Sequence, residues 1–374
     1  MRVLLLHGNA EWYGSDRSLV VLADALQRAG VEVTVGVPSE GALAAAVRRA
    51  GVDVVVTTPG AFRPLVVGPL GIVRYLLLEL PRSVLAVRRL ARRADVVHLN
   101  ISTLIGGLVG ARLARRPVVL HVRESYAGRE RAWRAYCRLV RPLITRAIAI
   151  SNDVASELRD AGLGDRTVVV HNGLPFAALA PPTARDEGGP VVAVGRINDW
   201  KGQDVLVEAV AVLRERGVRV PVEIAGDALP EQRHLEDALR ALAAERGVRD
   251  DVRLLGYVDD VPSLLARASI FVLPSKRPEP FGLALLDAMA HGLPCIATDA
   301  GGPRDMIDHG RTGLLTPMGD PVALADAIER LWGDADLRAR LGAAAAADVR
   351  ARFSIERTAA DVVSVYEAAL ASTS

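Results

Sequence analysis

Two carboxylates, Glu279 and Asp287, stand eight residues apart in the stretch "KRPEPFGLALLDAMAHGLP" (276–294). An apolar run typical of a strand precedes the stretch, so we expect Glu279 in a strand-to-helix loop and Asp287 about one and a half turns into the helix. Carboxylates accept hydrogen bonds from sugar or ribose hydroxyls, and helix N–H groups bind phosphate. The pattern favours a ligand site; a solvated loop followed by a helix with a polar face is the alternative.

Two cations occupy a second loop of the same kind, in "VGRINDWKGQDVLVEA" (194–209), where Arg196 and Lys201 follow another apolar run. The chain has only two lysines, Lys201 and Lys276, because arginine takes every other basic position. Arginine offers a planar fork and lysine a point charge, so the two could hold a diphosphate. The alternative is that both merely decorate a surface loop.

Weaker signals lie in three other loops. Gly14 and Ser15 could bring backbone N–H groups close to a phosphate, although neither a dinucleotide fingerprint nor a P-loop occurs. Gly301 and Gly302 form either another anion-binding turn or a tight connection. His121 ends the apolar run of "VVLHVRES", where a ligand contact competes with a structural role. No spacing is typical of a metal site, and no nucleophile elbow occurs.

Short β-rich runs alternate with helical stretches almost from end to end, which predicts βαβ units and parallel sheets. A Pro, Gly and charge cluster at 177–189 interrupts the alternation and is typical of a linker. We therefore predict an α/β protein with two tandem Rossmann-like, doubly wound domains, at 1–176 and 190–353, and a ligand cleft between them.

Composition is that of an ordinary globular protein, with 50% hydrophobic and 24% charged residues in 374. Cys137 and Cys295 lie far apart, which argues against a disulfide framework or a cysteine-based zinc site. The N-terminal apolar run is too short for a signal peptide, and no uncharged run reaches the ~20 residues of a spanning helix. We expect a cytoplasmic protein.

Charge is divided unevenly along the chain. Residues 1–180 hold 24 Lys+Arg against 14 Asp+Glu, a net +10, and the remainder holds 22 against 30, a net −8. The arginines lack interleaved aromatics, which total 4%, so no nucleic-acid partner is expected.

The stretch 62–93 combines apolar residues with arginines, which predicts peripheral contact with an anionic membrane, at the inner face of the cell membrane, or with a lipid-linked acceptor. The alternative is an amphipathic helix packed on its own sheet.

Taken together, "EPFGLALLDAMAHGLPCIATDAGGPRDMIDHGRTGLL" and "VGRINDWKGQDVLVEA" resemble the donor-site core of GT-B glycosyltransferases of family 4, a retaining, nucleotide-sugar-dependent group. The resemblance covers nearly all of 190–330 and is weaker in "YGSDRSL", "HVRES" and "HNGLPF". It implies a GT-B fold with an acceptor-binding first domain and a donor-binding second domain. It also implies that a C-terminal helix at about 354–374, which Ser354 could N-cap, packs back on the first domain.

The resemblance also implies roles for individual residues. Glu279 would contact the transferred sugar and Asp287, where the family has Glu, the ribose. Arg196 and Lys201 match the diphosphate-binding pair, and His121 matches a histidine near the donor sugar. The implied catalytic set is Glu279, His121, Arg196 and Lys201, with no metal.

The remaining donor contacts are less securely matched. Gly14 corresponds to the first glycine of an N-terminal Gly-Gly loop, but Ser15 replaces the second, and Asp305 replaces the usual Glu. The full donor-binding set comprises Gly14, Ser15, Arg196, Lys201, Tyr257, Glu279, Phe281, Gly282, Leu283 and Asp287.

The implied activity is metal-independent, retaining transfer of a hexose-type sugar from a nucleoside diphosphate sugar to an acceptor hydroxyl, in glycan, glycolipid or glycosylated-metabolite synthesis. The leaving phosphate would assist deprotonation of the acceptor. No cofactor is implied, because the donor is a substrate, with uridine diphosphate favoured over guanosine diphosphate. The acceptor would be a sugar, a lipid-linked compound or another small molecule. Two alternatives are a GT-B epimerase or sugar phosphorylase, and a nucleotide-sugar binding protein without turnover.

Overall fold

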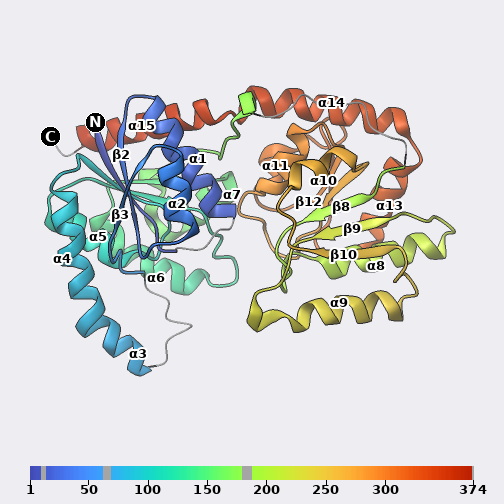
Figure 1. The fold of residues 1–374 in the computed structure, drawn as a ribbon, viewed down its shortest axis with the longest axis horizontal. Coiled ribbons are helices and arrows are strands. Elements are labelled where there is room, and N and C mark those ends of the chain that lie inside the picture. The colour runs from blue at the N-terminus through green and yellow to red at the C-terminus, as the bar shows by residue number, and fades with distance from the viewer. Residues whose placement is uncertain (10–13, 62–68, 179–187, 373–374) are drawn as a thin grey trace. The chain divides into compact units, whose positions relative to one another are not determined.

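A computed structural model describes residues 1–9, 14–61, 69–178 and 188–372. The chain divides into two compact units: unit 1 consists of Met1–Pro175 and Phe353–Ser374, and unit 2 of Phe176–Arg352. Each unit has its own parallel sheet with helices around it (Figure 1). The predicted class, two tandem doubly wound α/β domains, is confirmed. Most of the predicted linker, 179–187, lies outside the described residues.

Unit 1 is built on seven parallel strands in the order β3-β2-β1-β4-β5-β6-β7. Strands such as β4 are buried on both faces, as parallel strands covered by helices must be, and so consist almost wholly of apolar residues. The strand order reverses between β1 and β4, which makes that point the topological switch of the sheet. The strands are β1 (Arg2–Leu6), β2 (Glu32–Val37), β3 (Asp53–Val56), β4 (Val96–Leu99), β5 (Val118–Val122), β6 (Arg146–Ala149) and β7 (Thr167–Val169).

Helices α1, α2 and α4 to α7 follow the strands of unit 1, and α15 completes it. The bounds are α1 (Gly14–Arg28), α2 (Ala42–Arg49), α3 (Pro69–Arg74), α4 (Leu80–Ala91), α5 (Ile105–Leu113), α6 (Glu130–Val140), α7 (Asn152–Leu158) and α15 (Ile355–Ala371). A π-helix, Tyr75–Glu79, joins α3 to α4, and another, Arg159–Leu163, follows α7.

The C-terminal helix α15 belongs to the core of unit 1. Its buried face, which includes Val362 and Tyr366, packs with Leu5 and Leu19 of the first strand and first helix. The N-cap predicted for Ser354 is confirmed, because its hydroxyl accepts a hydrogen bond from the N–H of Arg357 at 3.2 Å.

Unit 2 has six parallel strands in the order β10-β9-β8-β11-β12-β13, with its switch point between β8 and β11. The strands are β8 (Val191–Val194), β9 (Val222–Ala225), β10 (Val252–Gly256), β11 (Ile270–Leu273), β12 (Cys295–Thr298) and β13 (Leu314–Thr316). The helices are α8 (Gln203–Glu215), α9 (His234–Glu245), α10 (Val261–Arg267), α11 (Leu283–Ala290), α12 (Pro303–Met306), α13 (Pro321–Trp332) and α14 (Ala335–Arg352).

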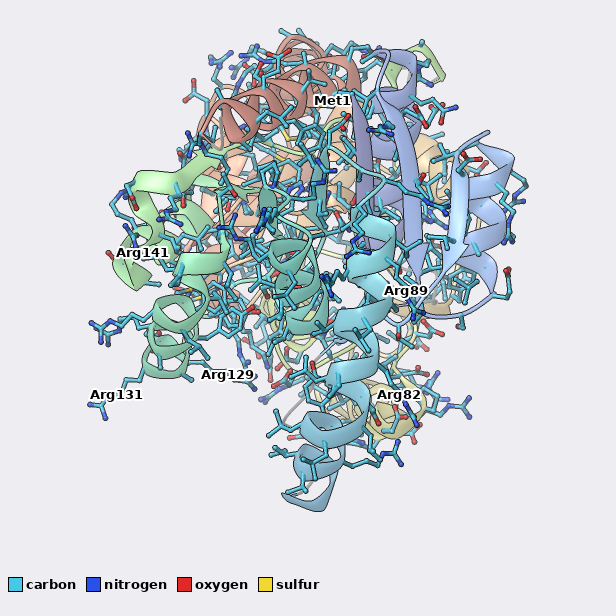
Figure 2. The ribbon with its side chains drawn as sticks, turned by 90° about the vertical axis from the view of Figure 1, so that its left-hand side faces the viewer. Met1, Arg82, Arg89, Arg129, Arg131 and Arg141 are labelled. Carbon is cyan, nitrogen blue, oxygen red and sulfur yellow. The ribbon has the colours of Figure 1, made fainter. Side chains whose placement is uncertain are left out.

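The helical run from α3 to α4 leaves many apolar side chains exposed. Leu77 is 69% exposed, and Figure 2 shows Arg82 and Arg89 on the same run. We name as the α3–α4 surface the exposed residues Val73, Leu76, Leu77, Leu78, Arg82, Leu85 and Arg89. Residues 62–68 of the predicted stretch lie outside the described part of the chain. Among described residues, no helix is both long and apolar enough to cross a bilayer.

Candidate active site

An ammonium–carboxylate pair lies at the switch point of unit 2. The loop after β8 carries Lys201 and the loop after the neighbouring strand β11 carries Glu279. Lys201 Nζ lies 2.7 Å from Glu279 Oε2, which also accepts a hydrogen bond from Ser275 Oγ at 3.1 Å. The side chains are only 18% and 7% exposed, respectively. Two residues predicted to serve one ligand are therefore in direct contact, where doubly wound sheets bind their ligands.

The loop after β8 holds Lys201 by a short turn. Asn198 Oδ1 accepts hydrogen bonds from the N–H groups of Trp200, at 3.1 Å, and Lys201, at 2.9 Å. Gly202 follows with a φ of 73°, and a Cβ there would lie 1.9 Å from the carbonyl oxygen of Pro274. Only glycine therefore lets this loop press against the loop after β11.

A glycine turn holds Glu279 from the other side. The N–H of Gly302 donates to the Glu279 carbonyl oxygen at 2.7 Å. Gly301 has a φ of 72°, and a Cβ there would lie 2.1 Å from the same oxygen. Of the two readings of this turn, the tight connection is the one these contacts support. Asp305, matched weakly, lies half-buried in α12 just beyond it.

Four further predicted residues surround the start of α11. Phe281 is buried, Gly282 is the N-cap with a φ of 100°, and Leu283 begins the helix. Asp287 is the fifth residue of α11 and is half-buried. The N–H groups of the first turn of α11 favour an anion next to the Lys201–Glu279 pair.

Arg196 and Tyr257 are the two remaining residues of unit 2 predicted to bind the donor. Arg196 is exposed, two residues beyond β8, and Gln203 Nε2 donates to its carbonyl oxygen at 3.0 Å. Tyr257 follows β10, the edge strand two places from β8, and is 58% exposed with its hydroxyl 3.3 Å from Asp259 Oδ1. The roles predicted for Arg196 and Tyr257 in binding the donor stay predictions.

The switch point of unit 1 holds a buried polar network. His7 follows β1, Asn100 follows β4 and Arg123 follows β5. Arg123 Nε donates to Asn100 Oδ1 at 2.8 Å, Asn100 Nδ2 lies 3.1 Å from His7 Nδ1, and His7 Nε2 lies 2.6 Å from Asp16 Oδ1. Burial lowers the pKa of Arg123 to about 10, so it remains a cation at neutral pH.

His121 joins this network at the carboxyl end of β5, as predicted, and is 1% exposed. Its Nδ1 lies 3.2 Å from His98 Nε2 and 3.4 Å from Arg123 Nη2. Burial, with the charge of Arg123, holds the pKa of His121 well below 6.5 and lowers that of His98 to about 3. Both rings are therefore neutral. His121 Nε2 is buried and has no hydrogen-bond partner among the described residues.

Gly14 and Ser15 begin α1 in unit 1. Gly14 is exposed, and the side chain of Ser15 lies outside the described residues. The loop that precedes them, 10–13, is also outside the described part, so the predicted phosphate contact stays a prediction.

Several residues of these networks were not predicted. The signal that could have identified most of them is a polar residue one or two places after an apolar strand. It occurs in "RVLLLHG", "DVVHLN", "VVLHVR" and "IFVLPS". The residues missed in this way are His7, Asn100, Arg123 and Ser275, together with His98, which lies inside a strand.

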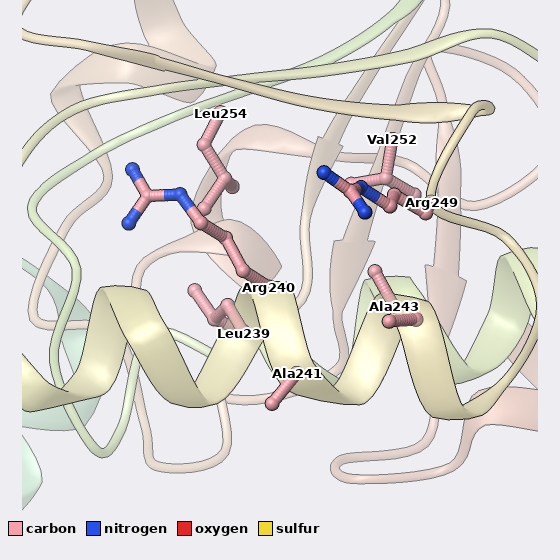
Figure 3. Close-up of a pocket in the computed structure, with 8 residues that line it drawn as sticks. Leu239, Arg240, Ala241, Ala243, Arg249, Val252 and Leu254 are labelled. Atoms are coloured by element: carbon pink, nitrogen blue, oxygen red, sulfur yellow. The ribbon is translucent and has the colours of Figure 1, made fainter.

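A hollow of about 420 Å³ lies in unit 2 between α9 and β10. Figure 3 shows Arg240 and Arg249 among its eight lining residues, none of which was predicted for the site. Across the described residues, no group of three or more His, Cys, Asp or Glu side chains could hold a metal ion.

Comparison with known proteins matches both halves of the chain. The family model "Glycosyltransferase Family 4" matches residues 12–177, and "Glycosyl transferases group 1" matches residues 180–348. Phosphatidyl-myo-inositol mannosyltransferase of Mycobacterium leprae is 32% identical over 73% of each chain. Alpha-D-kanosaminyltransferase of Streptomyces kanamyceticus is 34% identical over 48% of this chain, which covers 46% of that relative. The chain thus spans about half the length of the curated relatives it matches first.

Solved structures agree along the whole chain. Anabaena Alr3699/HepE, in complex with UDP and glucose, has a TM-score of 0.82 and 25% identity, covering 98% of this chain and 99% of its own. Sucrose-phosphate synthase of Thermosynechococcus elongatus has a TM-score of 0.78 at 21% identity, covering 99% of each chain, and so supports the fold alone. The chain belongs to the family 4-type glycosyltransferases of GT-B fold.

Proposed function

We propose that the protein transfers a hexose-type sugar from a nucleoside diphosphate sugar to an acceptor hydroxyl, with retention at the anomeric carbon and without a metal ion. The observation that carries the proposal is the Lys201–Glu279 pair, 2.7 Å long, beside the first turn of α11. Departure of the diphosphate develops negative charge, which Lys201, Arg196 and the N–H groups of α11 stabilise. Glu279 is proposed to accept a hydrogen bond from the transferred sugar.

The donor is proposed to be a uridine diphosphate sugar. The support is that Alr3699/HepE, similar over nearly the full chain, was solved with UDP and with UDP-glucose. Asp287, in α11, is proposed to accept a hydrogen bond from the ribose, and His121 to contact the sugar.

A donor and acceptor panel tests this function. Purified protein is incubated with UDP- and GDP-sugars and with free-sugar, inositol-type and lipid-linked acceptors, and both released diphosphate and glycosylated product are measured. We expect product with a UDP-sugar, roughly 100-fold less with Lys201→Ala, and little change with the matched control Lys276→Ala. Conversion of donor alone would show an epimerase, a requirement for inorganic phosphate a phosphorylase, and binding without turnover a binding protein.

The acceptor is proposed to be lipid-linked and to be reached by peripheral contact of the α3–α4 surface with an anionic membrane. Arg82, Leu85 and Arg89 of α4 recur at spacings of three and four residues, which places them on one helical face, and the exposed Leu78 lies in the π-helix just before it. Each arginine near an anionic surface contributes about 1 kcal/mol, and the leucines bury apolar area in the interface. Two relatives are named as a lipopolysaccharide core mannosyltransferase and a phosphatidyl-myo-inositol mannosyltransferase.

Vesicle flotation tests the membrane contact. We expect the protein to float with vesicles containing phosphatidylglycerol at low salt, and less at high salt, because surface charge interactions are screened. Leu77→Ser with Leu78→Ser should abolish flotation. The matched control Leu113→Ser changes another exposed leucine of unit 1 and should not. No flotation of the unaltered protein at low salt would overturn the contact while leaving the transfer reaction untouched.

A further inference from the structure

A hydrogen-bonded chain runs from the C-terminal helix to His121. The Tyr366 hydroxyl, on α15, lies 2.6 Å from His98 Nδ1, and His98 Nε2 lies 3.2 Å from His121 Nδ1. All three side chains are buried. This series of hydrogen bonds thus links α15, β4 and β5 inside unit 1. It ends at His121, whose Nε2 has no hydrogen-bond partner among the described residues.

The direction of each hydrogen bond follows from Arg123. A guanidinium can only donate, so His121 Nδ1, 3.4 Å from Arg123 Nη2, must accept. His98 Nε2 faces the same acceptor and must therefore donate. A neutral imidazole carries one N–H, so His98 Nδ1 accepts in turn, and the Tyr366 hydroxyl donates to it.

Reversing the donor and acceptor roles is unfavourable at both ends of this hydrogen-bond series. At one end it would set an N–H of His121 against the N–H of Arg123. At the other it would make Tyr366 an acceptor and leave its own proton without a partner in a fully buried position, which costs free energy. Burial also raises the pKa of Tyr366, so the phenol keeps the proton that it donates.

We propose that Tyr366 is a positioning residue which, through His98, holds His121 as the tautomer with its proton on Nε2. His121 then presents a neutral hydrogen-bond donor, and not a base, to an oxygen of the sugar substrate. This inference rests on the proposed function, because the sugar contact of His121 is part of that function. Tyr366 itself touches no substrate and acts only through the two histidines.

Nitrogen NMR tests the tautomer without any substrate. Protein with ¹⁵N-labelled histidine is compared with Tyr366→Phe, which keeps the ring and removes the hydroxyl, and His121→Asn assigns the resonance. We expect a pyrrole-type shift for His121 Nε2 and a pyridine-type shift for Nδ1, with both moving towards intermediate values in Tyr366→Phe. Ser364→Ala, an exposed change on the same helix, should leave them unchanged. A proton on Nδ1 in the unaltered protein would overturn the proposal.

A double-mutant cycle tests the consequence for transfer. Tyr366→Phe should lower kcat roughly three- to tenfold, with donor KM little changed, and should lower it no further in the His121→Asn background. A merely structural role would give the same loss in both backgrounds and overturn the proposal. His98→Gln, which removes the middle link, should reproduce the loss if Tyr366→Phe folds poorly. Inactive wild-type protein would refute the proposed function and leave the NMR result to decide the tautomer.

Discussion

Lys201 Nζ and Glu279 Oε2 lie 2.7 Å apart although their positions are separated by 78 residues of sequence. A second ion pair joins the loop after β11 to the first turn of α8, because Lys276 Nζ lies 2.6 Å from Asp204 Oδ2. The first pair is 18% and 7% exposed, and the second 34% and 41%. The only two lysines of the chain therefore form one mostly buried pair and one pair that is more than one-third exposed, which can be compared directly.

We predict that Lys201→Ala destabilises unit 2 far more than Lys276→Ala. Removing Lys201 leaves a buried carboxylate without its cation, at a cost of about 3 kcal/mol in the free energy of unfolding. The more exposed pair, Lys276–Asp204, contributes less than about 1 kcal/mol. Urea denaturation of both variants measures the difference. Adding Glu279→Gln to Lys201→Ala should recover stability by removing the orphaned charge, and equal losses in the two lysine variants would contradict the argument.

The two carboxylates of the opening motif should fail in different ways. Glu279→Gln should mainly lower kcat, because its proposed contact is at the transferred sugar. Asp287→Ala should mainly raise the donor KM, by about 10- to 150-fold, because it loses a charged hydrogen bond of roughly 1.5 to 3 kcal/mol to a remote ribose. Asp287→Glu restores the family residue and should keep most activity. If both Glu279→Gln and Asp287→Ala kept wild-type donor kinetics, residues 276–294 would be a solvated loop and helix that take no part in donor binding.

Acid should destabilise unit 1 through its buried histidines. The pKa of His98 is about 3 in the folded protein and near 6.5 when exposed, so between these values the unfolded chain binds more protons. The stability from this group is therefore complete above about pH 6.5 and lost as pH falls towards 3, by roughly 2 kcal/mol at pH 5. Denaturation at several pH values measures it. His98→Gln should flatten the dependence, whereas His234→Gln, at an exposed histidine of unit 2, should not.

Chelation should leave transfer intact. Lys201 and Arg196 are proposed to neutralise the leaving diphosphate, a task that a divalent cation performs in other enzymes. We expect the same initial rate of product formation in excess EDTA as in Mg²⁺. If EDTA abolished the rate and Mg²⁺ restored it, a metal ion, and not Lys201 and Arg196, would neutralise the diphosphate.

The fold was largely predictable because its signal is local. Strands such as "ASIFVLPS" and the helical run after Phe281 differ in period, and their alternation alone predicts parallel doubly wound sheets. The amphipathic helix at the C-terminus and its cap at Ser354 were also readable. The spacing of apolar residues in this helix does not show which core it packs into, because Val362 and Tyr366 could be buried in either unit. The structure places them in the core of unit 1.

The candidate site was predictable in part. Glu279 and Lys201 were each predicted to bind a ligand from their loops, and the family resemblance assigned them to one donor site. Their contact depends on which strands are neighbours, a property of the sheet and not of either motif. The network around Arg123 was missed for the same reason. His7, Asn100 and Arg123 lie up to 116 residues apart, and only the strand order β1-β4-β5 brings them together.

The place of α15 in unit 1 has a consequence for biosynthesis. Ribosomes add about 5 to 20 residues per second, so unit 1 waits roughly 10 to 35 s, while unit 2 is translated, before the helix that fills its core emerges. During that interval the apolar surface around Leu5 and Leu19 lacks the helix that covers it in the folded protein, and exposed apolar surface of this kind makes a nascent chain prone to aggregate. A protein whose translation stops within unit 2 would lack α15, and its first unit could not complete its core.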